Sequence, residues 1–200
     1  MNPRVLIALV VVAVGALAAA VLAAGEASDP GTARAGDRFE GSLMPPGIRA
    51  PEIGLTDERG EVVRMSELRG GPAIVTFLYS NCEDTCPAQA QQIKGALDDL
   101  GEDVPALAIS VDPANDTERS ARAFLSKQRM TGRMRFVLGS RDELRRVWSG
   151  YAIQPEVDDL AHSARIVLVD GRGVQRVGYP LDQVTPERLA HDLRLLGAGA

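Results

Sequence analysis

The sequence predicts an α/β domain in which helices cover a central mixed sheet. Two continuous apolar runs, residues 73–78 and 106–111, have the length and composition of strands that are buried on both faces. A segment with helical spacing of its apolar residues follows each run, and this alternation is typical of α/β domains. Hydrophobic residues make up 45% of the 200-residue chain and aromatic residues only 4%, so we expect a mainly aliphatic core.

The first half of this domain is expected to begin with a small β-hairpin. Residues 53–55 and 61–63 flank the polar turn 57–60, as in a tight antiparallel connection. The strand 73–78 follows, and after it a helix is expected because apolar residues recur at spacings of 4, 3 and 4. Its predicted buried stripe consists of Cys86, Ala90, Ile93 and Leu97.

The next helix is expected to start near Thr117, with Asp116 or Thr117 as its N-cap. A short strand is predicted at 136–138. Ser140 and Glu143 then form a capping-box pattern that opens another helix. The expected inner face of that helix consists of Leu144, Val147, Trp148 and Tyr151.

A second hairpin and a terminal helix complete the domain. Residues 165–169 and 174–177 are apolar runs separated by the turn 170–173. Thr185 as N-cap and Pro186 at the first helical position predict the last helix. A thioredoxin-like fold fits this order best, because neither a G-x-G-x-x-G nor a G-x-x-x-x-G-K-[ST] motif is present for a nucleotide-binding domain.

The N-terminal run determines the expected compartment. Residues 5–24 are apolar without interruption, and a helix of this length spans roughly 30 Å, the thickness of a hydrocarbon core. We therefore expect residues 1–25 to be a single-pass anchor, with a cleaved signal and a secreted domain as the alternative. Arg4 favours a cytoplasmic N-terminus and an extracytoplasmic domain at the cell membrane. Residues 26–50 are expected to be a flexible linker, and residues 51–200 the folded domain.

The only two cysteines, Cys82 and Cys86, follow the strand 73–78 at the expected start of a helix. In open α/β sheets this junction is where ligands bind. Their spacing is expected to place both sulfurs on one face of the first helical turn, where they could share a metal ion or form a disulfide. A purely structural disulfide is the less favoured alternative, because so short a loop removes little entropy from the unfolded chain.

Three segments resemble the Sco/SenC family of membrane-anchored, thioredoxin-fold copper proteins. They are AIVTFLYSNCEDTCP, SVDPANDT at 110–117, and AHSARIVLVDGRG at 161–173, and the resemblance covers about residues 53–196. It implies that Cys82, Cys86 and His162 bind a copper ion, Cu(I) or Cu(II). It also implies that the protein delivers copper to the copper centre of cytochrome c oxidase, or reduces the thiols of that centre. The oxidase subunit that holds this centre, or another copper or thiol-exchange partner, is then the expected partner.

The ligand chemistry agrees with that expectation, although zinc would accept the same residues. Two thiolates favour Cu(I), and an imidazole suits either copper oxidation state. Glu83 stands where the family usually has proline, and its charge is expected to raise the pKa of Cys82. His191 is expected to be an ordinary residue of the last helix.

Two enzymatic functions are alternatives to metal transfer. In an extracytoplasmic thiol-disulfide oxidoreductase, Cys82 would attack a disulfide and Cys86 would resolve the product. A thioredoxin-superfamily peroxidase would need an arginine beside Cys82, with Arg133, Arg135 and Arg165 as candidates. The net charge of −5 argues against a nucleic-acid partner.

Overall fold

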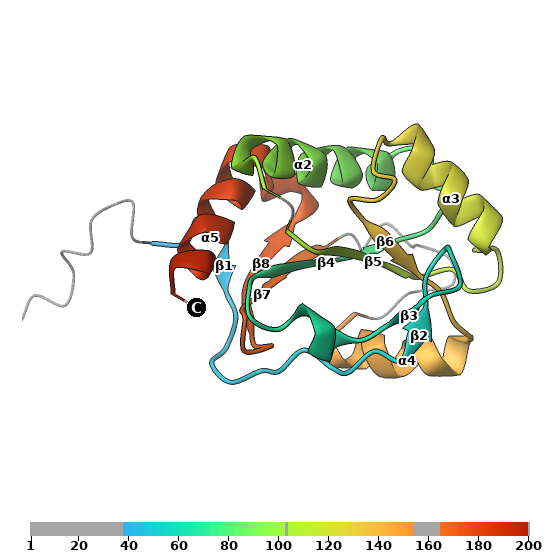
Figure 1. Ribbon diagram of the computed structural model, residues 1–200, viewed down its shortest axis with the longest axis horizontal. Coiled ribbons are helices and arrows are strands. Elements are labelled where there is room, and N and C mark those ends of the chain that lie inside the picture. The colour runs from blue at the N-terminus through green and yellow to red at the C-terminus, as the bar shows by residue number, and fades with distance from the viewer. Residues whose placement is uncertain (1–37, 103, 154–164, 200) are drawn as a thin grey trace, which may run out of the picture. The chain divides into compact units, whose positions relative to one another are not determined.

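Six strands form a mixed central sheet in the order β1-β8-β7-β4-β5-β6 (Figure 1). The computed structural model describes residues 38–102, 104–153 and 165–199, and Phe39–Ala200 forms one compact unit. Strands β4, β5 and β6 are parallel, whereas β7 runs antiparallel to β4, and β8 and β1 continue the antiparallel half. The predicted mixed sheet is therefore confirmed.

The strands of this sheet are β1 (Ser42–Leu43), β4 (Ala73–Leu78), β5 (Ala106–Ser110), β6 (Arg135–Val137), β7 (Arg165–Val169) and β8 (Gln175–Pro180). A separate antiparallel hairpin consists of β2 (Leu55–Thr56) and β3 (Val62–Val63). The helices are α2 (Thr85–Leu100), α3 (Glu118–Lys127), α4 (Arg141–Gly150) and α5 (Pro186–Ala198). Two short 3-10 helices lie at Met65–Leu68 and Leu181–Gln183.

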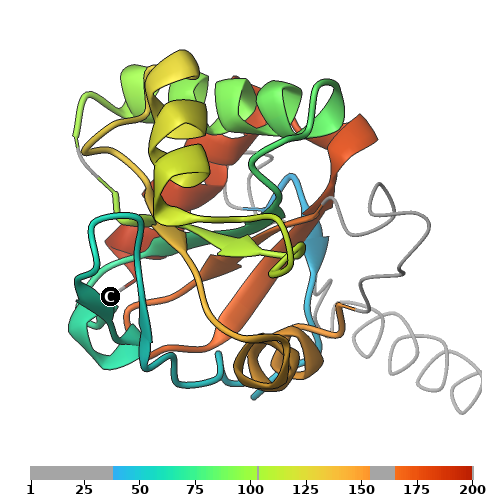
Figure 2. The same cartoon turned by 90° about the vertical axis from the view of Figure 1, so that its right-hand side faces the viewer.

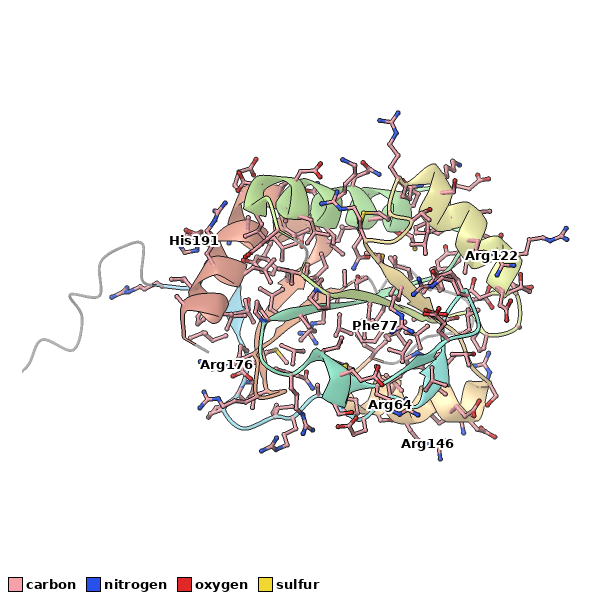
Figure 3. All side chains as sticks on the ribbon, in the orientation of Figure 1. Arg64, Phe77, Arg122, Arg146, Arg176 and His191 are labelled. Atoms are coloured by element: carbon pink, nitrogen blue, oxygen red, sulfur yellow. The ribbon has the colours of Figure 1, made fainter. Side chains whose placement is uncertain are left out.

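The helices form two layers, one on each face of the sheet. Helices α2, α3 and α5 lie on one face, and α4 lies on the other with the β2–β3 hairpin, as the two perpendicular views show (Figures 1 and 2). The buried run of β4 serves both layers because successive side chains point to opposite faces. Ile74 and Leu78 join the cluster under α2, α3 and α5, whereas Val75 and Phe77 join the cluster over α4 (Figure 3).

The predicted helix starts are confirmed. Ser140 and Glu143 form a reciprocal capping box at α4, and the Thr185 side chain accepts a hydrogen bond from the backbone N–H of Arg188 at α5. Thr117, and not Asp116, caps α3. Each cap satisfies backbone N–H groups that a helix leaves without an internal partner, which fixes where the helix begins.

The folded unit begins earlier than the sequence pattern indicates. Residues 39–50 were expected to belong to the linker, but β1 pairs antiparallel with β8 and forms the edge of the sheet. The buried Asp192 carboxylate on α5 fixes this segment, since it accepts hydrogen bonds from the backbone N–H groups of Glu40 at 2.8 Å and Gly41 at 3.0 Å. Gly41 lies so close to Val177 and Tyr179 that a Cβ atom there would clash with both side chains. This anchoring depends on residues about 150 positions away, which local patterning does not reveal.

The expected membrane anchor, residues 1–25, lies outside the described residues. Within the part of the chain that the structure describes, no helix combines the length and the apolar character needed to cross a membrane.

Candidate thiol and metal site

The two cysteines lie where β4 passes into α2, at the carboxyl end of a parallel strand. Helix α2 begins at Thr85, so Cys86 lies in its first turn whereas Cys82 lies in the preceding loop. The expectation that both cysteines share the first helical turn is therefore wrong. The pair still meets, because the backbone N–H of Cys86 donates a hydrogen bond to Cys82 Sγ at 3.2 Å.

Both cysteines are free thiols and both are buried, with 7% of Cys82 and 3% of Cys86 exposed. The Thr85 hydroxyl lies 3.5 Å from Cys82 Sγ, within hydrogen-bond distance for sulfur. Cys86 packs in the cluster under α2 as the sequence predicts, beside Ala90 and Ile93. The loop therefore presents Cys82 at the rim of the site and places Cys86 beneath it.

The thiols have opposite pKa shifts. Burial alone raises the pKa of Cys82, but hydrogen bonds from Cys86, Thr85 and the backbone of Asp84 outweigh it and lower the pKa to about 7. Burial, reinforced by the hydrogen bond to Cys82, raises the pKa of Cys86. The pKa of Cys82 is therefore lowered on balance, and the raising contribution expected of the Glu83 charge remains a prediction. Glu83 is exposed, where water and salt screen its charge, whereas the hydrogen bonds act at contact.

We expect the alkylation rate of the metal-free protein to rise with pH through a midpoint near 7, because only the Cys82 thiolate reacts rapidly. Thr85→Val should raise this midpoint by about 0.5 to 1 pH unit, since the variant lacks one hydrogen bond to the thiolate. Glu83→Gln is the control and should leave the midpoint nearly unchanged. Iodoacetamide kinetics between pH 5 and 10 measure all three proteins, and equal midpoints for Thr85→Val and the wild type would contradict this account.

A half-buried carboxylate, that of Asp116, holds the cysteine loop against the neighbouring strand, a role that differs from the helix cap expected of it. Asp116 accepts hydrogen bonds from the Ser80 backbone N–H at 2.7 Å, the Ser80 hydroxyl at 2.6 Å and the Ser110 hydroxyl at 2.6 Å. Burial raises the pKa of Asp116, although these hydrogen bonds oppose the effect. The motif SVDPANDT contains this residue, but its role depends on Ser80, 36 positions away. The sequence could therefore indicate Asp116 as a helix cap, but it could not indicate the hydrogen bonds from Asp116 to the cysteine loop.

Gln89 connects the cysteine helix to the start of β7. Its side-chain amide donates hydrogen bonds to the Thr76 hydroxyl and, at 2.9 Å, to the Arg165 carbonyl oxygen. Because β7 pairs antiparallel with β4, Arg165 lies at the same end of the sheet as the cysteine loop. This places the beginning of β7 beside α2, one turn after Cys86.

Of the two histidines, the structure describes His191 but not His162. His162, the predicted copper ligand, lies outside the described residues. His191 Nδ1 lies 3.0 Å from the Asp192 carboxylate on α5, as an ordinary helix residue would (Figure 3). Among residues 38–102, 104–153 and 165–199, no three His, Cys, Asp or Glu side chains gather closely enough to hold a metal ion.

Two of the arginines considered for peroxidase chemistry are engaged elsewhere. Arg133 pairs with Asp98 at 2.5 Å, and Arg135 pairs with the buried Asp57 carboxylate at 2.7 Å. Arg165 lies at the start of β7, with its guanidinium close to Gly178 on β8. None of the three therefore lines the cavity beside Cys82, which is described below.

Comparisons with known proteins agree with this fold and this loop. The family model of SCO1/SenC matches residues 49–196. Protein SenC of Rhodobacter capsulatus is 36% identical over 117 residues, a match that covers 55% of this chain and 49% of SenC. Copper-bound ScoI of Bradyrhizobium japonicum is 28% identical with a TM-score of 0.61, and the match covers 74% of this chain and 99% of ScoI.

BsSco, a Sco-family cytochrome c oxidase assembly protein in which a disulfide switch has been identified, has a TM-score of 0.67 at 21% identity. The match covers 78% of this chain and 98% of BsSco, and at this identity it shows a shared fold. The family match spans most of the folded unit, including both cysteines, helices α2 to α4, α5 up to residue 196, and the whole sheet except β1. The chain therefore belongs to the SCO1/SenC family.

Proposed function

We propose that this protein binds one copper ion through Cys82, Cys86 and His162 and transfers it to the copper centre of a respiratory cytochrome c oxidase. The observation that carries this proposal is the paired thiols, held together by the hydrogen bond from Cys86 N–H to Cys82 Sγ. Two adjacent thiolates are soft ligands that favour Cu(I). Copper bound to ScoI of Bradyrhizobium japonicum supports copper as the cargo in this family.

The position of β7 supports His162 as the third ligand. His162 precedes Arg165 by three residues, a chain length that reaches at most about 11 Å. Gln89 holds the Arg165 carbonyl against α2, at the same end of the sheet as the cysteine loop. An imidazole from this segment would give the Cys2His donor set that suits copper in either oxidation state.

A thiol-disulfide oxidoreductase is the second candidate function, and the unequal pKa values favour it. Cys82, with a pKa of about 7, is substantially ionised at neutral pH and can attack a disulfide sulfur. Cys86 has a raised pKa and is the buried partner that would resolve the mixed disulfide. The disulfide switch of BsSco is consistent with such chemistry on this fold.

His162→Ala separates the two functions. We expect the Cu(I) affinity to fall by more than about tenfold, because the variant lacks an imidazole ligand. Tenfold is roughly the smallest loss typical of removing a group that only supports a metal ligand. The rate of thiol exchange at Cys82 should remain near the wild-type value, since that reaction needs no imidazole. His191→Ala is the matched control, because the chain has only 2 histidines and this one lies on α5. Equal copper affinities for the two variants would remove His162 from the site.

We also propose that residues 1–25 anchor the domain on the outer face of the cell membrane. The uninterrupted apolar run at 5–24 and the single Arg4 support this placement. We expect the full-length protein in the membrane fraction, and its release into the soluble fraction by deletion of residues 1–25. A soluble wild-type protein shortened by about this length would instead identify a cleaved signal.

A further inference from the structure

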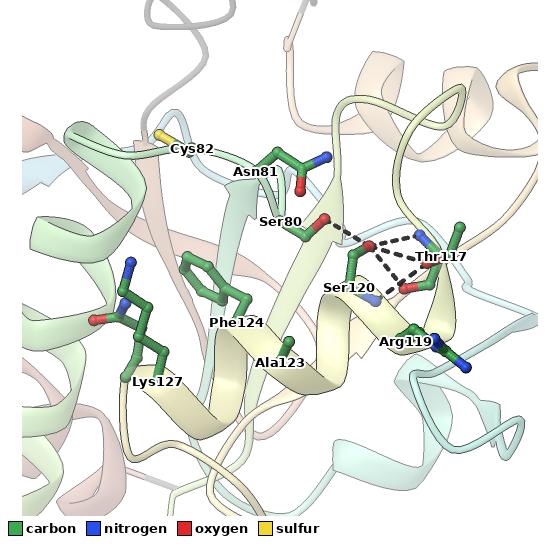
Figure 4. Close-up of a pocket in the computed structure, with 10 residues that line it drawn as sticks. Ser80, Asn81, Cys82, Thr117, Arg119, Ser120, Ala123, Phe124 and Lys127 are labelled. Atoms are coloured by element: carbon green, nitrogen blue, oxygen red, sulfur yellow. Dashed lines mark hydrogen bonds between the residues drawn. The ribbon is translucent and has the colours of Figure 1, made fainter.

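A groove lies directly beside Cys82, between the cysteine loop and α3 (Figure 4). Its volume is about 390 Å³, within the range of pockets that bind small molecules or short peptide segments. Residues 80–82 form one wall and α3 forms the other. A molecule bound in this groove would therefore lie next to Cys82, the more reactive cysteine of the pair.

The walls of the groove are bonded to each other. The Ser80 hydroxyl lies 2.8 Å from the Ser120 hydroxyl and also donates to Asp116, which fixes the loop against the start of α3. The end of α3 is held to α2, because the Gln91 side chain on α2 donates to the Gln128 carbonyl oxygen at 3.0 Å. Because these hydrogen bonds hold α3 against the cysteine loop and against α2, a ligand would not have to bring the two walls together.

Among the described residues that line the groove, two are cations and none is a carboxylate. Arg119 lies near the start of α3 and Lys127 at its last residue, and neither forms an ion pair within the described chain. By contrast, Arg122, which lies one turn from Arg119 on the same helix, does form an ion pair, with Glu118 at 3.2 Å. In a protein of net charge −5, a cationic groove beside the reactive thiol points to an anionic ligand.

The spacing of the cations indicates the form of the ligand. Arg119 and Lys127 are separated by eight residues of helix, about 12 Å along the axis. An extended peptide covers that distance in three to four residues. Between the two cations lie Ala123, which is exposed, and Phe124, which is only 4% exposed, so Ala123 provides most of the apolar surface there (Figure 4).

We propose that this groove binds a short acidic segment of the protein partner that exchanges copper or thiols at Cys82. Two carboxylates three to four residues apart pair with Arg119 and Lys127, and the segment passes over Ala123. The inference rests on the proposed function, because only an exchange partner has to be held beside Cys82. It adds the location of the docking site and the charge of the partner.

Two synthetic cysteine peptides test the proposal with the reduced full-length protein. One contains two aspartates four residues apart and the other has asparagine at both positions, and each is activated as a mixed disulfide with thionitrobenzoate. The Cys82 thiolate attacks the peptide sulfur, a new disulfide forms, and the thionitrobenzoate thiolate leaves with the electron pair of the broken bond. Its absorbance gives the rate. We expect the aspartate peptide to react about tenfold faster at low ionic strength, as two exposed ion pairs allow.

Arg119→Gln/Lys127→Gln should reduce the rate ratio of the two peptides to about one. The control Arg145→Gln/Arg146→Gln removes the same charge from exposed positions on α4, on the other face of the sheet, and should keep the wild-type ratio (Figure 3). A change in the pKa of Cys82 would alter both rates equally and cancel in the ratio. A wild-type ratio of one, or equal ratios in the two double variants, would overturn the proposal.

Two further measurements distinguish other outcomes. If inorganic phosphate lowers the ratio to one at an ionic strength where chloride does not, the groove is a site for small anions and the peptide proposal fails. Cu(I) binding is measured on the same variants and should be unchanged. If the wild-type protein binds no copper but keeps a groove-dependent ratio, the proposed copper function fails and the docking site stands.

Discussion

Replacement of Cys82 or Cys86 by serine is expected to lower the Cu(I) affinity by more than about 100-fold. This exceeds the 10- to 100-fold loss typical of removing a group that only supports a metal ligand, because the thiolate itself is lost. A serine hydroxyl is a hard ligand and ionises too weakly to replace a thiolate at neutral pH. Competition with a chromophoric Cu(I) chelator measures the affinity.

The control for these variants is Thr85→Ser, which keeps both thiols and a hydroxyl near Cys82 Sγ. It should bind copper as the wild type does. Thermal unfolding must accompany the titrations, because Cys86 is 3% exposed and a buried hydroxyl there costs some stability. A single-cysteine variant that is folded and binds one Cu(I) with unchanged affinity would exclude a site made of two thiolates.

The largest expected effect on stability is that of Asp192→Ala. The Asp192 carboxylate is fully buried and accepts hydrogen bonds from the Tyr179 hydroxyl at 2.5 Å and from the backbone N–H groups of Glu40 and Gly41. Removal of this acceptor breaks three hydrogen bonds and leaves the Glu40 and Gly41 N–H groups without a partner, whereas the Tyr179 hydroxyl can still donate to the Arg188 carbonyl oxygen at 3.1 Å. We therefore expect the free energy of unfolding to fall by at least about 3 kcal/mol. The melting temperature should fall by roughly 6 to 12 °C.

Two variants make this test specific. Asp192→Asn keeps one acceptor oxygen and should be intermediate, whereas Asp182→Ala removes an exposed carboxylate and should change the stability by no more than about 0.5 kcal/mol. Hydrogen exchange should accelerate first at the amides of Glu40 and Gly41, because β1 loses its anchor to α5. Equal stabilities of Asp192→Ala and Asp182→Ala would refute this role.

The sequence predicts the elements whose patterns are local. The run Ala73–Leu78 matches β4 residue for residue, and the Ser140–Glu143 capping box opens α4 where expected. Both patterns depend on residues within a few positions of each other, so the side chains themselves carry the information.

Features that depend on distant residues were not predictable in this way. β1 has two residues in a stretch rich in proline and glycine, and it forms because β8 and Asp192 supply its partners. The pKa of Cys82 is lowered by hydrogen bonds that form only in the folded loop. The sequence shows the neighbouring Glu83 charge but not these hydrogen bonds. The tether from Asp116 to Ser80 likewise joins two segments that only the folded sheet brings together.

The central claim is that the reduced pair of thiols, completed by His162, holds one copper ion. Copper titration of the full-length protein, first reduced and then oxidised, tests this claim most directly when metal stoichiometry and thiol content are measured on the same samples. We predict one Cu(I) per reduced chain with two titratable thiols in the metal-free protein, and no tightly bound copper in the oxidised chain. Equal copper binding by the oxidised protein, or no binding by the fully reduced protein, would contradict the account.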